Sequence, residues 1–188
     1  MSISYKLKNY MLKMKGFEKA PPRKQFSKIL WSWLGAFLGI YTISILNEKI
    51  HLNANDTLFL VGSFGASAVL IFAAPQADFS QPRNFLGGHV MSALVGITIY
   101  KFLHFDIEIL SAIAVSVSIV VMHFTRTLHP PGGATALVAI VGSEQTHQLG
   151  YLFAFMPILL NSFVMFLIAL VINNLSNNPK RHYPRYWF

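Results

Sequence analysis

The sequence predicts an all-α polytopic membrane protein with about six transmembrane segments, two of them short or broken. Hydrophobic residues make up 54% of the 188 residues and charged residues only 12%, against about 25% charged in soluble domains. The chain also contains six long uncharged runs, and about 20 residues cross the hydrocarbon core of a bilayer as a helix. The runs are residues 29–47, 57–77, 84–100, 109–125, 127–143 and 145–179.

The basic residues predict the orientation of these segments. Of the 15 Lys and Arg residues, 11 lie in the two tails, eight before the first run and three after the last. By the positive-inside rule both tails are cytoplasmic, which requires an even number of crossings. Arg83 and Arg126 then lie inside, whereas Lys49 and Lys101, each near acidic residues, lie outside. We expect a multi-pass protein of the bacterial inner (plasma) membrane.

The first segment, residues 1–26, is predicted to be basic and amphipathic. Residues 3–14 place apolar side chains at helical spacing among lysines, which is typical of a helix lying on the anionic headgroups of the inner leaflet. A disordered basic tail is the alternative. The transmembrane domain follows at residues 27–175, and residues 176–188 form a basic aromatic tail that we expect to anchor at the membrane interface. Because the charges flank hydrophobic runs, the pI of about 9.8 does not indicate nucleic-acid binding.

The second and fifth runs contain similar hexapeptides, Gly-Ala-Ser-Ala-Val-Leu at residues 65–70 and Gly-Ala-Thr-Ala-Leu-Val at residues 133–138. Each follows a segment that resists helix formation, at residues 62–64 and 130–132. The match predicts two inverted three-span repeats whose broken helices begin from opposite faces and meet near the midplane. The alternative is that small residues at this spacing serve only close helix packing.

The fifth run is interrupted by His-Pro-Pro-Gly-Gly at residues 129–133. Irregular backbone is tolerated at membrane depth only where protein buries it or water reaches it, so the break indicates a binding or permeation site. Pro131 suits the first turn of a helix, and the exposed amides of such an N-terminus, approached past glycines, prefer an anion. The predicted substrate-binding residues are Gly62, Ser63, Gly65, Ser67, His129, Pro130, Pro131, Gly132, Gly133 and Thr135.

Arg83, His89 and Arg126 are the other candidate functional residues. Ionisable groups near or inside spans are costly and mark ion paths. We therefore predict that the arginines steer anions and that His89 or His129 relays a proton. The alternatives are arginines that snorkel to headgroups and a histidine that only bonds between helices. The chain has no cysteine, and His123 and His129 share their runs with no carboxylate, so neither a metal site nor a cofactor is predicted.

An enzymatic alternative is an intramembrane serine protease, because Gly-Ala-Ser-Ala at residues 65–68 resembles the Gly-x-Ser loop of rhomboid-type proteases. Such a nucleophile needs a base within reach. Residues 150–174 of the last run contain no histidine, so Ser67 would depend on His89 or His123. We therefore expect no enzymatic activity.

The chain resembles the HPP family of integral membrane proteins, named for the motif that stands here at residues 129–131. The similarity runs from about residue 22 to residue 184. It is carried by residues 65–70, 74–75, 81–84, 87–89 and 125–137. The family is usually described as having four spans, whereas six are predicted here. Some members are linked to nitrite transport, so the resemblance implies nitrite as a substrate.

These observations predict a membrane transporter or channel for a small inorganic anion, with nitrite as the expected substrate. The expected partners are this anion and the lipid bilayer, without nucleic acid, and assembly into a homo-oligomer is compatible with the sequence. The alternative from another class is a non-transporting membrane scaffold. That alternative is favoured if the polar residues satisfy one another and no cavity reaches them.

Overall fold

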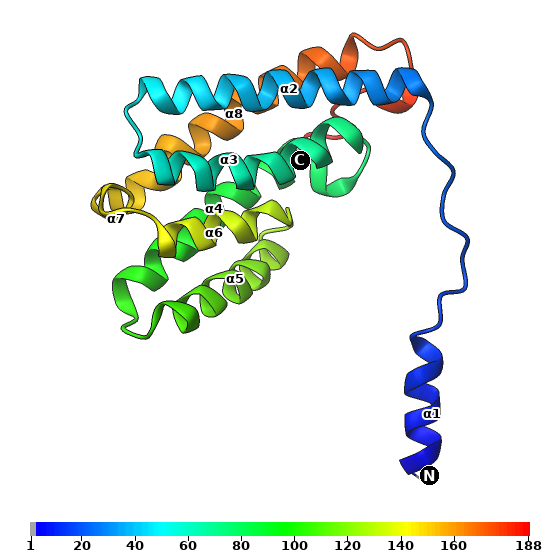
Figure 1. The fold of residues 1–188 in the computed structure, drawn as a ribbon, viewed down its shortest axis with the longest axis horizontal. Helices are drawn as coiled ribbons and strands as arrows, with labels where there is room; N and C mark the ends of the chain where they lie inside the picture. The colour runs from blue at the N-terminus through cyan, green and yellow to red at the C-terminus, as the bar shows by residue number, and fades with distance from the viewer. Residues whose placement is uncertain (1–2) are drawn as a thin grey trace.

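The computed structural model describes residues 3–188, which contain helices and no β-strand (Figure 1). The predicted all-α fold is confirmed. The α-helices are α1 Ile3–Lys13, α2 Phe26–Lys49, α3 Ala54–Ala68, α4 Pro82–Phe102, α5 Ile107–Phe124, α6 Pro131–Val141, α7 Glu144–Leu149 and α8 Leu160–Asn174. Short 3-10 or π turns are η1 Val69–Ala73, η2 Asp78–Ser80, η3 Gly150–Ala154, η4 Phe155–Leu159 and η5 Pro179–Arg181.

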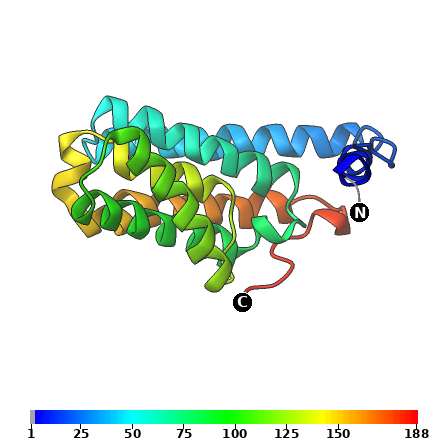
Figure 2. The same ribbon diagram turned by 90° about the horizontal axis from the view of Figure 1, so that it is seen from below.

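Helices α2 to α8 form an elongated bundle, and α1 lies apart from it, beyond the end at which α2 begins (Figures 1 and 2). Within residues 3–188, five helical stretches are long and apolar enough to cross a membrane, and α6 is a shorter apolar helix. The two tails meet at one end of the bundle, because Arg181 donates to the carbonyl oxygen of Lys28 at 3.2 Å. The start of α2 and the chain after α8 therefore lie at the same end of the bundle, which agrees with the predicted even number of crossings.

A sixth apolar segment, the fifth in chain order, consists of α6 and the non-helical chain that precedes it. The carbonyl oxygen of Pro131, at the start of α6, accepts a hydrogen bond from Ser63 in the middle of α3. Ser143, just after α6, donates to Asp56 at the start of α3. Helix α6 therefore runs beside the first half of α3, between Ser63 and Asp56, and residues 127–129 precede it as non-helical chain.

The predicted helix break at residues 62–64 is wrong. Helix α3 runs without interruption from Ala54 to Ala68 and ends in the π turn η1. The hexapeptide at 65–70 thus lies at the C-terminal end of a helix, whereas the hexapeptide at 133–138 lies at the start of α6. Only the second half of the proposed repeat begins with a broken helix.

The last crossing is also irregular. Residues 144–174 contain α7, two short turns and α8, and Met156 is extended, as expected of a residue before proline. Asp56 fixes α7 to the start of α3, because its buried carboxylate accepts hydrogen bonds from Ser143 and Thr146. The irregular spans of the structure are therefore the fifth, which contains α6, and the sixth, which leads into α8, whereas the sequence predicted breaks in the second and fifth.

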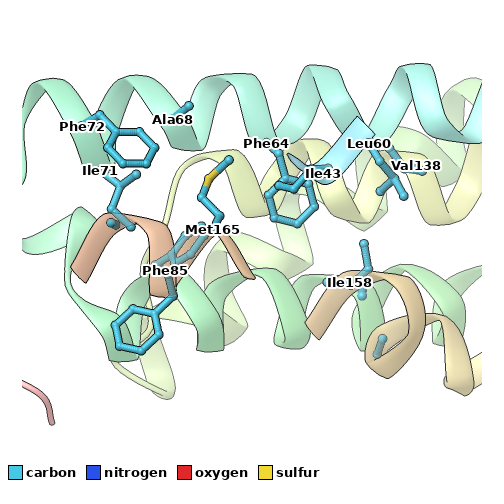
Figure 3. Close-up of a cluster of buried hydrophobic side chains, with 14 of the residues drawn as sticks. Ile43, Leu60, Phe64, Ala68, Ile71, Phe72, Phe85, Val138, Ile158 and Met165 are labelled. Carbon is cyan, nitrogen blue, oxygen red and sulfur yellow. The ribbon is translucent and has the colours of Figure 1, made fainter. Parts of the chain in front are cut away.

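The main hydrophobic core lies between α2, α3, α4 and α8 (Figure 3). Bulky side chains from these helices interdigitate there without exposure to solvent, and α4 packs on its other side against α5 and α6. The core thus positions the buried faces of α3 and α4 that carry the polar residues described next. Among its members are Ile43, Leu60, Phe64, Phe72, Phe85 and Met165.

Candidate functional site: a buried imidazole and hydroxyl network

Five of the predicted site residues meet in one buried cluster between α3, α4 and the start of α6. Each is at most 2% exposed, although all carry polar side chains. They come from parts of the chain that are far apart in sequence, so the fold itself brings them together. The members of this polar network are Ser63 and Ser67 of α3, His89 of α4, His129 of the extended segment and Thr135 of α6.

Hydrogen bonds connect the polar network into a continuous chain. Ser67 Oγ lies 2.9 Å from His129 Nε2 and 2.8 Å from His89 Nε2. The other nitrogen of His89, Nδ1, lies 2.7 Å from Thr135 Oγ1, which is 3.0 Å from Ser63 Oγ. Ser67 and Thr135 are the third residues of the two similar hexapeptides, so His89 bridges equivalent positions of both.

The end of the chain determines the direction of its hydrogen bonds. His129 Nδ1 lies 2.7 Å from the carbonyl oxygen of Phe79, which can only accept, so Nδ1 carries the proton. In a neutral ring Nε2 then accepts from the Ser67 hydroxyl, and Ser67 in turn accepts from His89 Nε2–H. His89 Nδ1 is left to accept from Thr135. Adding a proton at the Thr135 end and shifting each one along would place the charge on His129.

Aromatic rings enclose the two imidazoles. The ring of Phe64 stacks on His89 with centroids 4.5 Å apart, and Phe85 meets His89 and His129 edge-on at 5.4 and 5.3 Å. Gly88 makes room for the extended segment, because a Cβ there would lie 2.5 Å from the Cβ of His129. The imidazoles thus share an apolar enclosure in which the hydroxyls and one carbonyl oxygen are their polar partners.

The amides at the helix break already have acceptors. The N–H of Gly132 donates to the carbonyl oxygen of His129 at 2.8 Å, and that of Gly133 donates to Pro130 at 3.1 Å. Gly132 faces α4 and α5, where a Cβ would meet Ser92 at 2.7 Å. These amides are therefore not free donors in this conformation, and anion binding by them stays a prediction.

Other predicted site residues lie outside the polar network. Gly62 and Gly65 are on the outer side of α3, where a Cβ added to either would have no described atom within 4 Å, and Pro130 is exposed. Arg126 is exposed beyond the end of α5, and Arg83 is half-buried in the first turn of α4. Both arginines lie on the side of the network from which the chain enters α4, so their charges act at one end of the bundle.

The Ser67 to His89 contact has the distance expected of a nucleophile and its base. Ser67 is nevertheless fully buried, and its proton is directed at His129. The amides of Gly132 and Gly133, which would be the nearby oxyanion donors, are already bonded. The arrangement therefore fits proton relay better than hydrolysis.

Several residues that hold this site were not predicted from the sequence. Asn84 donates to the carbonyl oxygen of Leu128, directly before His129, and Gln81 donates to Pro75 and Ala77 in the loop that carries Phe79. Both belong to the Gln-Pro-Arg-Asn motif, which could have indicated them. No sequence pattern indicates that the carbonyl oxygen of Phe79 accepts a hydrogen bond from His129. Within residues 3–188, no three His, Asp or Glu side chains gather as a metal site would require.

The family described as HPP, transmembrane region, matches residues 21–184 of this sequence. That match includes every member of the polar network and every helix from α2 to α8. The chain belongs to the HPP family. It is accordingly an integral multi-pass membrane protein, and the polar network lies in the transmembrane region of an HPP protein.

Two curated relatives are transmembrane proteins of Dictyostelium discoideum. One is 44% identical over 191 residues, covering 100% of this chain and 60% of the relative. The other is 44% identical over 176 residues, covering 92% of this chain and 60% of the relative. The chain thus spans about 60% of the length of these HPP relatives. No solved structure matches it.

Proposed function

We propose that this HPP protein carries a small monovalent anion across the membrane together with a proton, with nitrite as the anion that the family resemblance implies. The polar network carries the proposal. Ionisable side chains at membrane depth are costly and mark ion or proton pathways. Here two imidazoles, both nitrogens of each engaged, are linked through one serine hydroxyl.

Joint movement with a proton has a physical reason. An isolated anion in an apolar interior is strongly unfavourable, whereas an anion beside a protonated imidazole forms a neutral pair. The network is closed in this conformation. The proposed cycle therefore includes an open conformation in which residues 127–130 move away from α4, with Arg83 and Arg126 concentrating anions at the mouth.

A second candidate function is that of a non-transporting membrane scaffold. It is favoured by the mutual hydrogen bonding of the polar network and by the bonded amides of Gly132 and Gly133. A scaffold needs no open conformation and no proton movement. Only the transporter is therefore expected to show protein-dependent anion uptake.

Purified full-length protein in liposomes tests the proposal. We expect saturable nitrite uptake that rises when the outside is made acidic, with weaker uptake of nitrate, formate and chloride as comparison anions. Protein-free liposomes measure the passive entry of nitrous acid, which is subtracted. If none of the four anions shows protein-dependent uptake from correctly folded protein, transport is contradicted and the scaffold is favoured.

We also propose that both tails face the cytoplasm. The chain has no native cysteine, so single cysteines placed at Glu48, Asp106, Glu144 and Lys180 can be labelled individually. We expect a membrane-impermeant maleimide to label the first three positions in intact cells and position 180 only after permeabilisation. Labelling at position 180 in intact cells would show that the tails face the outside and would contradict the proposed orientation.

A further inference from the structure

A second site lies at the end of the bundle where the tails meet. A cavity of about 440 Å³ opens there, within the range of about 300–1,000 Å³ usual for small-molecule sites. Among the described residues, four cationic side chains line it and no acidic one does. This basic cavity is lined by Lys24, Lys28, Lys180 and Arg181, with Ser32 and Gln76 as polar neighbours.

Arg181 is the central residue of the basic cavity. Its side chain is buried, with 3% of the residue exposed, and its two terminal nitrogens donate to neutral groups. Nη2 donates to the carbonyl oxygen of Phe72 at 2.8 Å, and Nη1 lies 3.2 Å from both the Lys28 carbonyl oxygen and Ser32 Oγ. The bond to Phe72 caps the end of η1, and the other two attach Arg181 to the start of α2. These bonds give both terminal nitrogens of the guanidinium a hydrogen-bond acceptor, but none of the acceptors carries a negative charge.

Two features of Arg181 remain unexplained by that capping role. Its Nε is buried and has no hydrogen-bond partner within residues 3–188. Burial also lowers the pKa of Arg181 from its usual value, since loss of water disfavours the charged form. The carboxylate of Asp78 is already paired with Arg185 at 3.1 Å. In the part of the chain that the structure describes, this buried cation therefore has an unused donor and lacks an anionic partner.

The neighbouring elements add positive potential. Helix α2 begins at Phe26 beside the cavity, with no acidic residue in its first turn and no side-chain cap from the described residues. The amides of such a helix start favour negative charge. Guanidinium groups bind phosphoryl oxygens through several donors, and lysines add point charges.

We propose that the basic cavity binds a phosphoryl-type oxyanion, held by Arg181 and by Lys24, Lys28 and Lys180. The ligand is either the headgroup of an anionic phospholipid or a free phosphate ion, because both present the same oxygens. The site is separate from the polar network and does not depend on the proposed transport. The experiment that tests it therefore measures ligand binding and not anion transport.

Full-length protein in zwitterionic detergent micelles provides the test at constant ionic strength. Inorganic phosphate is titrated while thermal unfolding is followed, and native mass spectrometry measures retention of phosphatidylglycerol against phosphatidylcholine. We expect the wild type to gain stability with phosphate or to retain phosphatidylglycerol selectively. Stabilisation by phosphate identifies a free oxyanion, and selective lipid retention alone identifies a headgroup.

Two charge-matched double variants decide whether the basic cavity is responsible. The double variant Lys24→Gln, Lys28→Gln should weaken binding by at least about tenfold, or about 1.4 kcal/mol. The control Lys13→Gln, Lys15→Gln removes the same charge from the exposed N-terminal segment and should bind like the wild type. Arg181→Gln should lose binding most, and the lysine variant remains informative if Arg181→Gln fails to fold. No binding by the wild type, or equal loss in both double variants, would overturn the proposal.

Discussion

Ser67→Ala is expected to abolish the stimulation of anion uptake by an acidic exterior. The Ser67 hydroxyl is the direct link between the imidazoles of His89 and His129, at 2.8 and 2.9 Å. Without it no proton can pass between the rings by this route. Because a positioned proton carrier contributes about 10²-fold or more to a transfer step, we expect acid-stimulated uptake in liposomes to fall by at least about tenfold.

Ser118→Ala is the matched control for this variant. Ser118 is also fully buried in a span, but its hydroxyl has no hydrogen-bond partner within the described chain. Its removal should leave uptake unchanged. Ser67→Ala also leaves two ring nitrogens without partners, at a cost of about 1–3 kcal/mol each, so size-exclusion profiles must show folded protein. His129→Gln keeps a polar side chain that cannot carry a proton and should give the same loss. Wild-type acid stimulation in a folded Ser67→Ala protein would contradict the relay.

Gly132→Ala and Gly133→Ala are expected to behave oppositely although the residues are adjacent. A Cβ at Gly132 would lie 2.7 Å from Ser92 Oγ, 2.9 Å from the Gly88 carbonyl oxygen and 3.0 Å from Met122 Sδ. Overpacking of this kind costs about 1–3 kcal/mol, and at this position it also pushes α6 away from α4. We expect a lower unfolding temperature in detergent and loss of uptake.

At Gly133 the nearest atom to a new Cβ is Val115 Cγ1 at 3.5 Å, an ordinary contact. Alanine should therefore be accommodated, and its better helix propensity adds up to about 1 kcal/mol. Loss of uptake in a stable Gly133→Ala protein would instead support anion binding at the backbone amides of the break.

The sequence was sufficient to predict the transmembrane segments and most residues of the polar network, but not the geometry of that network. Uncharged runs and basic tails were sufficient for the fold class, because the bilayer restricts what can cross it. Ser67, His129 and Thr135 were predicted from the two hexapeptides and the helix break, and His89 from its place within an uncharged run, and these residues do meet. Their mutual hydrogen bonds could not be predicted, since these depend on how α3, α4 and α6 pack.

One local prediction failed for a physical reason, and one residue of the C-terminal tail is more buried than its local pattern indicates. Glycines at 62 and 65 do not break α3, because a helix in lipid keeps its backbone hydrogen bonds even where propensity is poor. The aromatic tail is predicted to lie at the membrane interface, and Trp187 and Phe188 are exposed, whereas Tyr183 is 2% exposed and its hydroxyl donates to the Ser80 carbonyl oxygen at 2.8 Å. Burial raises the pKa of this phenol. The tail therefore belongs partly to the core, which no local pattern indicates.

The half-length of α6 has a consequence for the biogenesis of the protein. Its 11 residues span only about 16 Å, against about 30 Å of hydrocarbon, so the segment is a weak signal for insertion by itself. Helix α4 holds the chain before α6 in two ways. Asn84 donates to the carbonyl oxygen of Leu128, and Gly88 leaves space for His129. Stable membrane integration of this segment therefore requires α4 to be in the bilayer first. The order of helices along the chain satisfies this requirement, since α4 and α5 emerge from the ribosome before α6.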